Sequence, residues 1–129
     1  MKKTILTSVL ATFMILFVSH NGNAQTAKSN IEVIQFHSEH RCMTCNKIEK
    51  LTRETLKEFK AIPFSLVNVD DTKNEKKATQ FEATGTALFL YNPKTRNKKN
   101  LTDFAFMTAS NEAKFKEGLK KEIQLFLKS

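Results

Sequence analysis

The chain has 129 residues, and its 21 lysines and arginines against 13 aspartates and glutamates give a formal net charge of +8. This length allows one domain with a single core and excludes two. The basic residues are dispersed and alternate with glutamates, as on a solvated surface, so we expect no nucleic-acid partner.

The first 24 residues have the pattern of a cleaved secretory signal peptide. Lys2 and Lys3 form a charged start, residues 5–18 are apolar, and residues 22–24 offer the small side chains that a signal peptidase recognises. The apolar run falls short of the roughly 20 residues that span a bilayer, which argues against the alternative, an uncleaved membrane anchor. We therefore predict an exported protein, periplasmic or extracellular, without a stable membrane span.

The next segments predict a strand followed by a helix. Residues 25–30 are polar and predict a flexible entry to a domain that spans residues 31–129. Residues 31–38 are rich in β-branched and aromatic side chains, which favours a strand buried largely on both faces. Over residues 44–60 the pattern turns helical, with one apolar stripe at spacings of three and four. That stripe contains Ile48, Leu51, Thr55 and Phe59.

A second strand is predicted at residues 64–70, after the helix-breaking Pro63. Two strands joined by a helix form a βαβ unit, in which the strands run parallel. Residues 73–83 predict a second helix, capped by residues 70–72 and followed by Gly85.

The remaining segments predict a hairpin and a last helix. Residues 86–91 read as a third strand, and residues 92–100 are polar and basic, as in a turn. Residues 101–107 alternate loosely and predict a fourth strand, antiparallel to the third. The last helix begins near Ser110, and its apolar residues are Phe115, Leu119, Ile123, Phe126 and Leu127. The predicted order is β-α-β-α-β-β-α.

Cys42 and Cys45 are the two cysteines of the chain, and they lie where the first predicted strand meets the first helix. A spacing of three brings both sulfurs to one side of the first helical turn, close enough for a disulfide. The positive end of the helix dipole favours a thiolate there. This placement predicts thiol redox chemistry.

Two alternatives to redox chemistry remain open. A purely structural disulfide is one, although a loop this short constrains little of the unfolded chain. The other is a metal site, because His37, His40, Cys42 and Cys45 fall within nine residues. Two imidazoles and two thiolates suit copper or zinc, and the thiols alone suit soft metals.

The element order, with Cys-x-x-Cys opening the first helix, resembles the thioredoxin fold. Residues 67–70 (Val-Asn-Val-Asp) are similar to the second core strand of that family, and residues 84–87 (Thr-Gly-Thr-Ala) to the turn into its third strand. The resemblance implies an α/β thioredoxin-like fold, a four-stranded mixed sheet with helices on both faces. It also implies thiol–disulfide exchange with a protein partner and no cofactor.

The resemblance assigns roles within the motif. Cys42 is expected to be the exposed attacking thiol, with its thiolate favoured by Arg41 and His40, and Cys45 the resolving thiol. Met43 and Thr44 are expected to set the redox poise of the pair.

A narrower resemblance covers residues 41–45 and 48–52. There the chain is similar to exported bacterial thioredoxin-like proteins named as the ArsF subunit of nitrophenyl-compound nitroreductases, a name linked to arsenic resistance. This resemblance implies the alternative of a non-catalytic module that binds a soft metal or metalloid, or of a nitroreductase subunit.

Three residues depart from the family pattern. Ala87 replaces the proline that is normally cis beside the cysteines, so a trans bond is expected there. Arg41 stands in place of a tryptophan, and Phe36 in place of a buried aspartate that helps to deprotonate the second thiol. These changes favour a specialised partner over general reductase activity.

Overall fold

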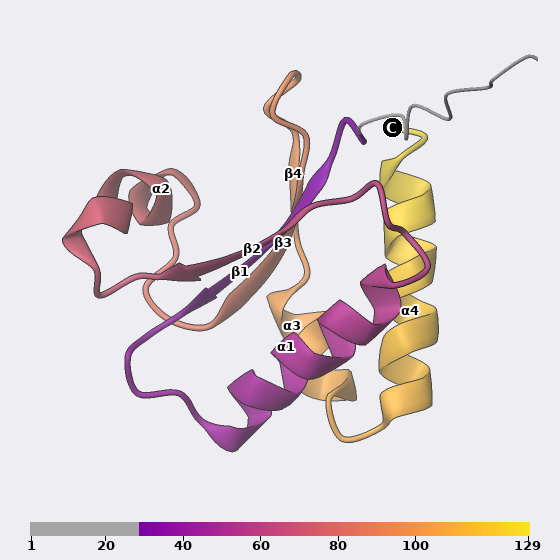
Figure 1. Ribbon diagram of the computed structural model, residues 1–129, viewed down its shortest axis with the longest axis horizontal. Helices are drawn as coiled ribbons and strands as arrows, with labels where there is room; N and C mark the ends of the chain where they lie inside the picture. Colours follow the sequence, from indigo (N-terminus) through magenta and orange to yellow (C-terminus); the bar gives the residue numbers. More distant parts are fainter. Residues whose placement is uncertain (1–28) are drawn as a thin grey trace, which may run out of the picture.

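Figure 1 shows the computed structural model, which describes residues 29–129. The predicted signal peptide and most of the predicted entry segment lie outside these residues. No described helix combines the length and the hydropathy that crossing a bilayer requires.

Four strands form one mixed sheet in the order β2-β1-β3-β4. The central strand β1 runs parallel to β2 and antiparallel to β3, and β3 pairs with β4 in an antiparallel hairpin. The parallel β1–β2 pair confirms the predicted βαβ unit. The strands are β1 (Glu32–His37), β2 (Phe64–Asn68), β3 (Ala87–Tyr91) and β4 (Lys98–Asn100).

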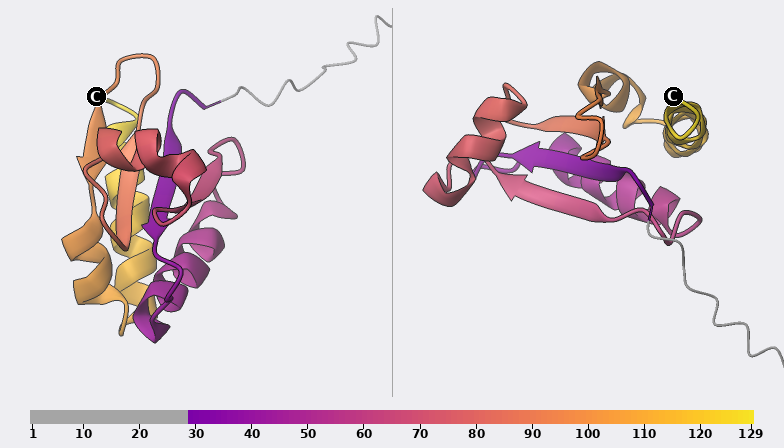
Figure 2. Two further views of the ribbon diagram at one scale, coloured as in Figure 1. Left: turned by 90° about the vertical axis from the view of Figure 1, so that its left-hand side faces the viewer. Right: turned by 90° about the horizontal axis from the view of Figure 1, so that it is seen from above.

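Helices cover both faces of the sheet (Figure 1). Helices α1, α3 and α4 lie on one face, and α2 lies on the other, as the turned views of Figure 2 also show. A 3-10 turn, Thr72–Asn74, precedes α2 and is capped by Asp71, whose carboxylate accepts from the Lys73 amide. The helices are α1 (Met43–Leu56), α2 (Glu75–Gln80), α3 (Thr102–Thr108) and α4 (Glu112–Phe126).

The prediction of a strand at residues 101–107 is wrong. Residues 98–100 form the short strand β4, and residues 102–108 form helix α3. The buried side chains Leu101, Ala105 and Thr108 follow helical spacing, whereas Phe106 and Met107 are exposed. Residues 29–129 therefore contain one α-helix more than their sequence predicted, placed directly before α4.

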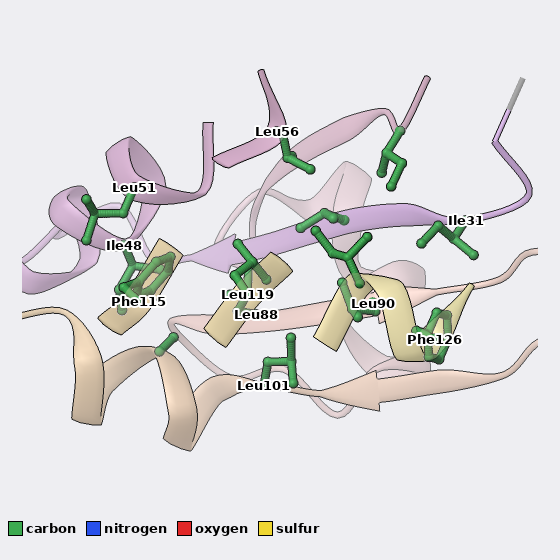
Figure 3. Close-up of a cluster of buried hydrophobic side chains, with 14 of the residues drawn as sticks. Ile31, Ile48, Leu51, Leu56, Leu88, Leu90, Leu101, Phe115, Leu119 and Phe126 are labelled. Atoms are coloured by element: carbon green, nitrogen blue, oxygen red, sulfur yellow. The ribbon is translucent and has the colours of Figure 1, made fainter. Parts of the chain in front are cut away.

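The two faces of β1 contact different cores. Val33 belongs to the larger cluster, which Figure 3 shows filled by side chains of α1, α4 and the sheet. Ile34 and Phe36 belong to a smaller cluster on the α2 side. Because side chains alternate along a strand, Gln35 shares the Val33 face, toward α1. The strand is buried on both faces, as predicted.

The strand order, the parallel first unit and the antiparallel hairpin make this a thioredoxin-like α/β fold, as the sequence predicted. The fold places the amino end of α1 beside the carboxyl end of β1.

Candidate functional site

The Cys42 and Cys45 side chains are joined by a disulfide at the amino end of α1, and their Cα atoms are 5.1 Å apart. Cys42 is exposed, whereas Cys45 retains 5 % of its accessible surface. An incoming thiol or disulfide therefore reaches the Cys42 sulfur first.

Cys42 is the N-cap of α1. Its backbone is extended, and its Sγ accepts a hydrogen bond from the Cys45 amide at 3.1 Å. The first turn of α1 contains no acidic residue. A negative charge on the Cys42 sulfur would thus face the positive end of the helix dipole and one directed N–H donor.

Gln35, on β1, contacts the second cysteine and was not predicted as a site residue. It is fully buried, and its Nε2 donates to the backbone carbonyl oxygen of Cys45 at 3.0 Å. Its Oε1 is buried without a hydrogen-bond partner among the described residues. An unpaired buried acceptor costs about 1–3 kcal/mol. The sequence did contain a signal for Gln35, because it is a polar residue inside a strand predicted to be buried on both faces.

Thr86 is a second contact that the sequence did not single out. Its Oγ1 lies 3.1 Å from the Sγ of Cys45 and donates to it. Ala87, which follows it, begins β3 and packs against the cluster on the α2 side. Within residues 29–129 no peptide bond is cis, which agrees with the trans bond expected at Ala87.

Phe36, expected where the family has a buried aspartate, lies in the smaller cluster on the α2 side of the sheet. The Phe36 ring faces away from α1 and packs against Phe81 in a tilted arrangement and against Phe89 edge to face, at centroid distances of 5.3 and 5.9 Å. The buried polar residue beneath the cysteines is Gln35, one position earlier. An amide that does not titrate stands beside Cys45.

Arg41 is engaged by Glu49. Arg41 Nη2 donates to Glu49 Oε2 at 2.6 Å, and Arg53 donates to the other carboxylate oxygen at 2.8 Å. Burial raises the pKa of Glu49, but the hydrogen bonds from Arg41 and Arg53 outweigh it, and the pKa lies below its ordinary value. The Arg41 charge is thus largely countered by Glu49, which weakens its expected support for a Cys42 thiolate.

The two histidines do not complete a metal site with the cysteines. His37 Nδ1 lies 2.9 Å from the Ser38 carbonyl oxygen, and His40 is exposed in the loop before α1. Asp70 holds this loop by accepting from the Glu39 amide at 2.8 Å. Across residues 29–129, no three His, Cys, Asp or Glu side chains gather as metal ligands would. The alternative of a metal centre gains no support.

Exposed apolar side chains lie on α1 directly after Cys42 and on α3. Met43 is 89 % exposed, and on α3 Phe106 is 42 % and Met107 80 % exposed. A shallow pocket of about 300 Å³ lies between the two helices. Its lining is Met43, Thr44, Lys47, Phe106, Ala109 and Ser110. Because Met43 directly follows Cys42, the pocket begins one residue from the exposed cysteine.

No protein-family model and no curated protein matches the chain. Among solved structures, Fasciola hepatica thioredoxin is similar at 22 % identity and a TM-score of 0.49, over 73 % of this chain and 82 % of that chain. Chlamydomonas reinhardtii thioredoxin f2 is similar at 18 % identity and a TM-score of 0.46, over 68 % and 82 %. A structure described as a malarial protein has 22 % identity and a TM-score of 0.43, over 60 % and 93 %. The fold assignment rests on the strand order and connectivity of the chain itself.

Proposed function

We propose that this chain is an exported thiol–disulfide exchange protein that passes two electrons between its Cys42–Cys45 pair and a protein partner. The observation that carries the proposal is the asymmetry of the pair: one sulfur is exposed at a helix amino end, and the other is buried one turn inside. Export rests on the signal-peptide pattern of residues 1–24.

The exchange proceeds in two displacements. In the reduced protein the Cys42 thiolate attacks one sulfur of a partner disulfide, and the other partner sulfur leaves with the electron pair of the broken bond. Cys45 then attacks the Cys42 sulfur, closes the disulfide of the present structure, and releases the partner as a dithiol. The two displacements reduce one partner disulfide and oxidise one cysteine pair.

The two alternatives have less support. The loop between Cys42 and Cys45 is too short for a disulfide whose role is stability alone. The soft-metal or metalloid module lacks an assembled set of ligands among the described residues. The comparisons support no ArsF name, so we propose no nitroreductase or arsenic role.

The test equilibrates residues 25–129 with glutathione buffers and measures the reduced fraction by thiol alkylation, alongside the rate of insulin-disulfide reduction. We expect a reversible two-electron couple, no exchange in Cys42→Ser, and a trapped mixed disulfide in Cys45→Ser. Unchanged insulin reduction by Cys42→Ser would refute the proposal, and so would a pair that never reduces.

A further inference from the structure

The side chain of Gln35 offers an acceptor that the oxidised protein does not use. Its Nε2 faces the Cys45 carbonyl oxygen, and because that oxygen can only accept, the orientation of the amide is determined by chemistry. Its Oε1, on the same buried side chain, has no hydrogen-bond partner among residues 29–129. Buried acceptors are rarely left unpaired. A different redox state of the protein could therefore supply a hydrogen-bond donor to Gln35 Oε1.

Reduction supplies a hydrogen-bond donor in the residue that Gln35 contacts. A dithiol reductant breaks the Cys42–Cys45 bond, closes its own disulfide, and delivers two electrons and two protons to the pair. Cys45 thereby changes from a disulfide sulfur without a proton into a buried thiol with an S–H group. Once released from Cys42, its side chain is free to rotate about the Cα–Cβ bond.

Thr86 already donates to the Cys45 sulfur in the oxidised protein. Its hydroxyl donates to the Cys45 sulfur at 3.1 Å, so the sulfur already has its donor. The thiol proton then requires a separate acceptor. Because Cys45 is only 5 % exposed, water has little access to serve as that acceptor.

We propose, on the basis of the exchange function above, that Gln35 is a positioning residue that holds Cys45 as a neutral thiol. Its Oε1 accepts a hydrogen bond from the Cys45 S–H in the reduced protein and accepts none from the described residues in the oxidised protein. Gln35 thus stabilises the reduced form selectively and makes the pair easier to reduce. The amide does not titrate, so it holds the thiol proton and does not remove it.

The test replaces Gln35 by Met, which keeps its length and removes both polar atoms. We expect the equilibrium constant for reduction by glutathione to fall about tenfold, equivalent to about 30 mV for a two-electron couple. A merely structural residue would destabilise both redox forms equally and leave this constant unchanged.

The matched control is Thr52→Val. Thr52, on α1 seven positions beyond Cys45, is also fully buried, and its Oγ1 has no hydrogen-bond partner in the part of the chain that the structure describes. Its replacement is expected to leave the constant within a factor of two. An equal shift in both variants, or no shift in Gln35→Met, overturns the inference.

A measurement on the unsubstituted protein covers the case in which Gln35→Met does not fold. The ¹³C resonance of the Gln35 side-chain carbonyl should move downfield on reduction as it gains a hydrogen bond, and an unmoved resonance overturns the inference. A protein without any reversible couple refutes the exchange function itself, whereas a normal couple with unaffected Gln35 refutes this inference alone.

Discussion

Arg41 donates from Nη2 to Glu49 Oε2 at 2.6 Å, so the residue directly before the exposed cysteine is tied to the second turn of α1. Glu49 also binds Arg53, and its side chain is only 17 % exposed. The contact orients the loop that leads into Cys42. It also pairs the Arg41 guanidinium with a carboxylate charge.

Replacing Glu49 by Gln should therefore destabilise the protein in a pH-dependent way. Because the folded-state pKa of Glu49 lies below the ordinary value of 4.5, its contribution is fully present above that value. It is lost as the pH falls through the lower folded-state pKa. We expect a loss of about 1–2 kcal/mol at pH 7, shrinking in acid, by urea unfolding.

The control for that variant is Glu58→Gln. Glu58 pairs with Lys120 at 2.6 Å but is 60 % exposed, so its loss should cost little at any pH. A Glu49→Gln deficit that persists unchanged in acid would contradict the assignment of the effect to the carboxylate charge.

Thr86→Val should slow the reduction of the disulfide. When a thiolate attacks Cys42, Cys45 leaves with negative charge, and the Thr86 hydroxyl is the donor that stabilises it. We expect the second-order rate constant with dithiothreitol to fall about tenfold, as for a lost hydrogen bond to a charged group. Stopped-flow measurement of thiol release checks this, with Thr84→Val, an exposed residue of the same turn, as control. Equal rate constants in both variants would contradict a role for the Thr86 hydroxyl in stabilising the departing Cys45 sulfur.

Met107→Ser should impair exchange with proteins but not with small disulfides. Met107 is 80 % exposed on α3, and Phe106 directly before it lines the pocket that Met43 also lines. Truncation of Met107 removes apolar area that a protein partner would cover. We expect insulin reduction to slow about fivefold, corresponding to about 1 kcal/mol. Leu125→Ser is the matched control, since Leu125 is 51 % exposed on α4 and lines a different pocket. Slowing by both variants, or with glutathione disulfide as well, would contradict a docking role.

Phe36→Leu should lower stability by about 1–2 kcal/mol through lost aromatic packing. Phe36 is fully buried on the α2 side of the sheet, against Phe81 and Phe89. We therefore expect the same loss in the oxidised and in the reduced protein, measured by urea unfolding with and without dithiothreitol. A loss confined to one redox form would place Phe36 in the site after all.

Local pattern predicted most of the fold. The stripe through Ile48 and Leu51 predicted α1, and both are buried as expected. The failure at residues 101–107 also has a local cause, because a short apolar run fits either period. Packing decided between strand and helix, because Leu101 and Ala105 both join the core with α4 when the segment is helical.

The sequence by itself determined the cysteine spacing, the helix that begins there and the strand before it, because each depends on neighbours along the chain. The tertiary structure alone decided what surrounds the buried sulfur. Gln35 and Thr86 reach Cys45 from 10 and 41 positions away, and both contacts depend on the register of β1 and β3. A shift of one residue would turn Gln35 to the other face and bring Phe36 toward Cys45. That register is a property of the paired sheet, which no local pattern contains.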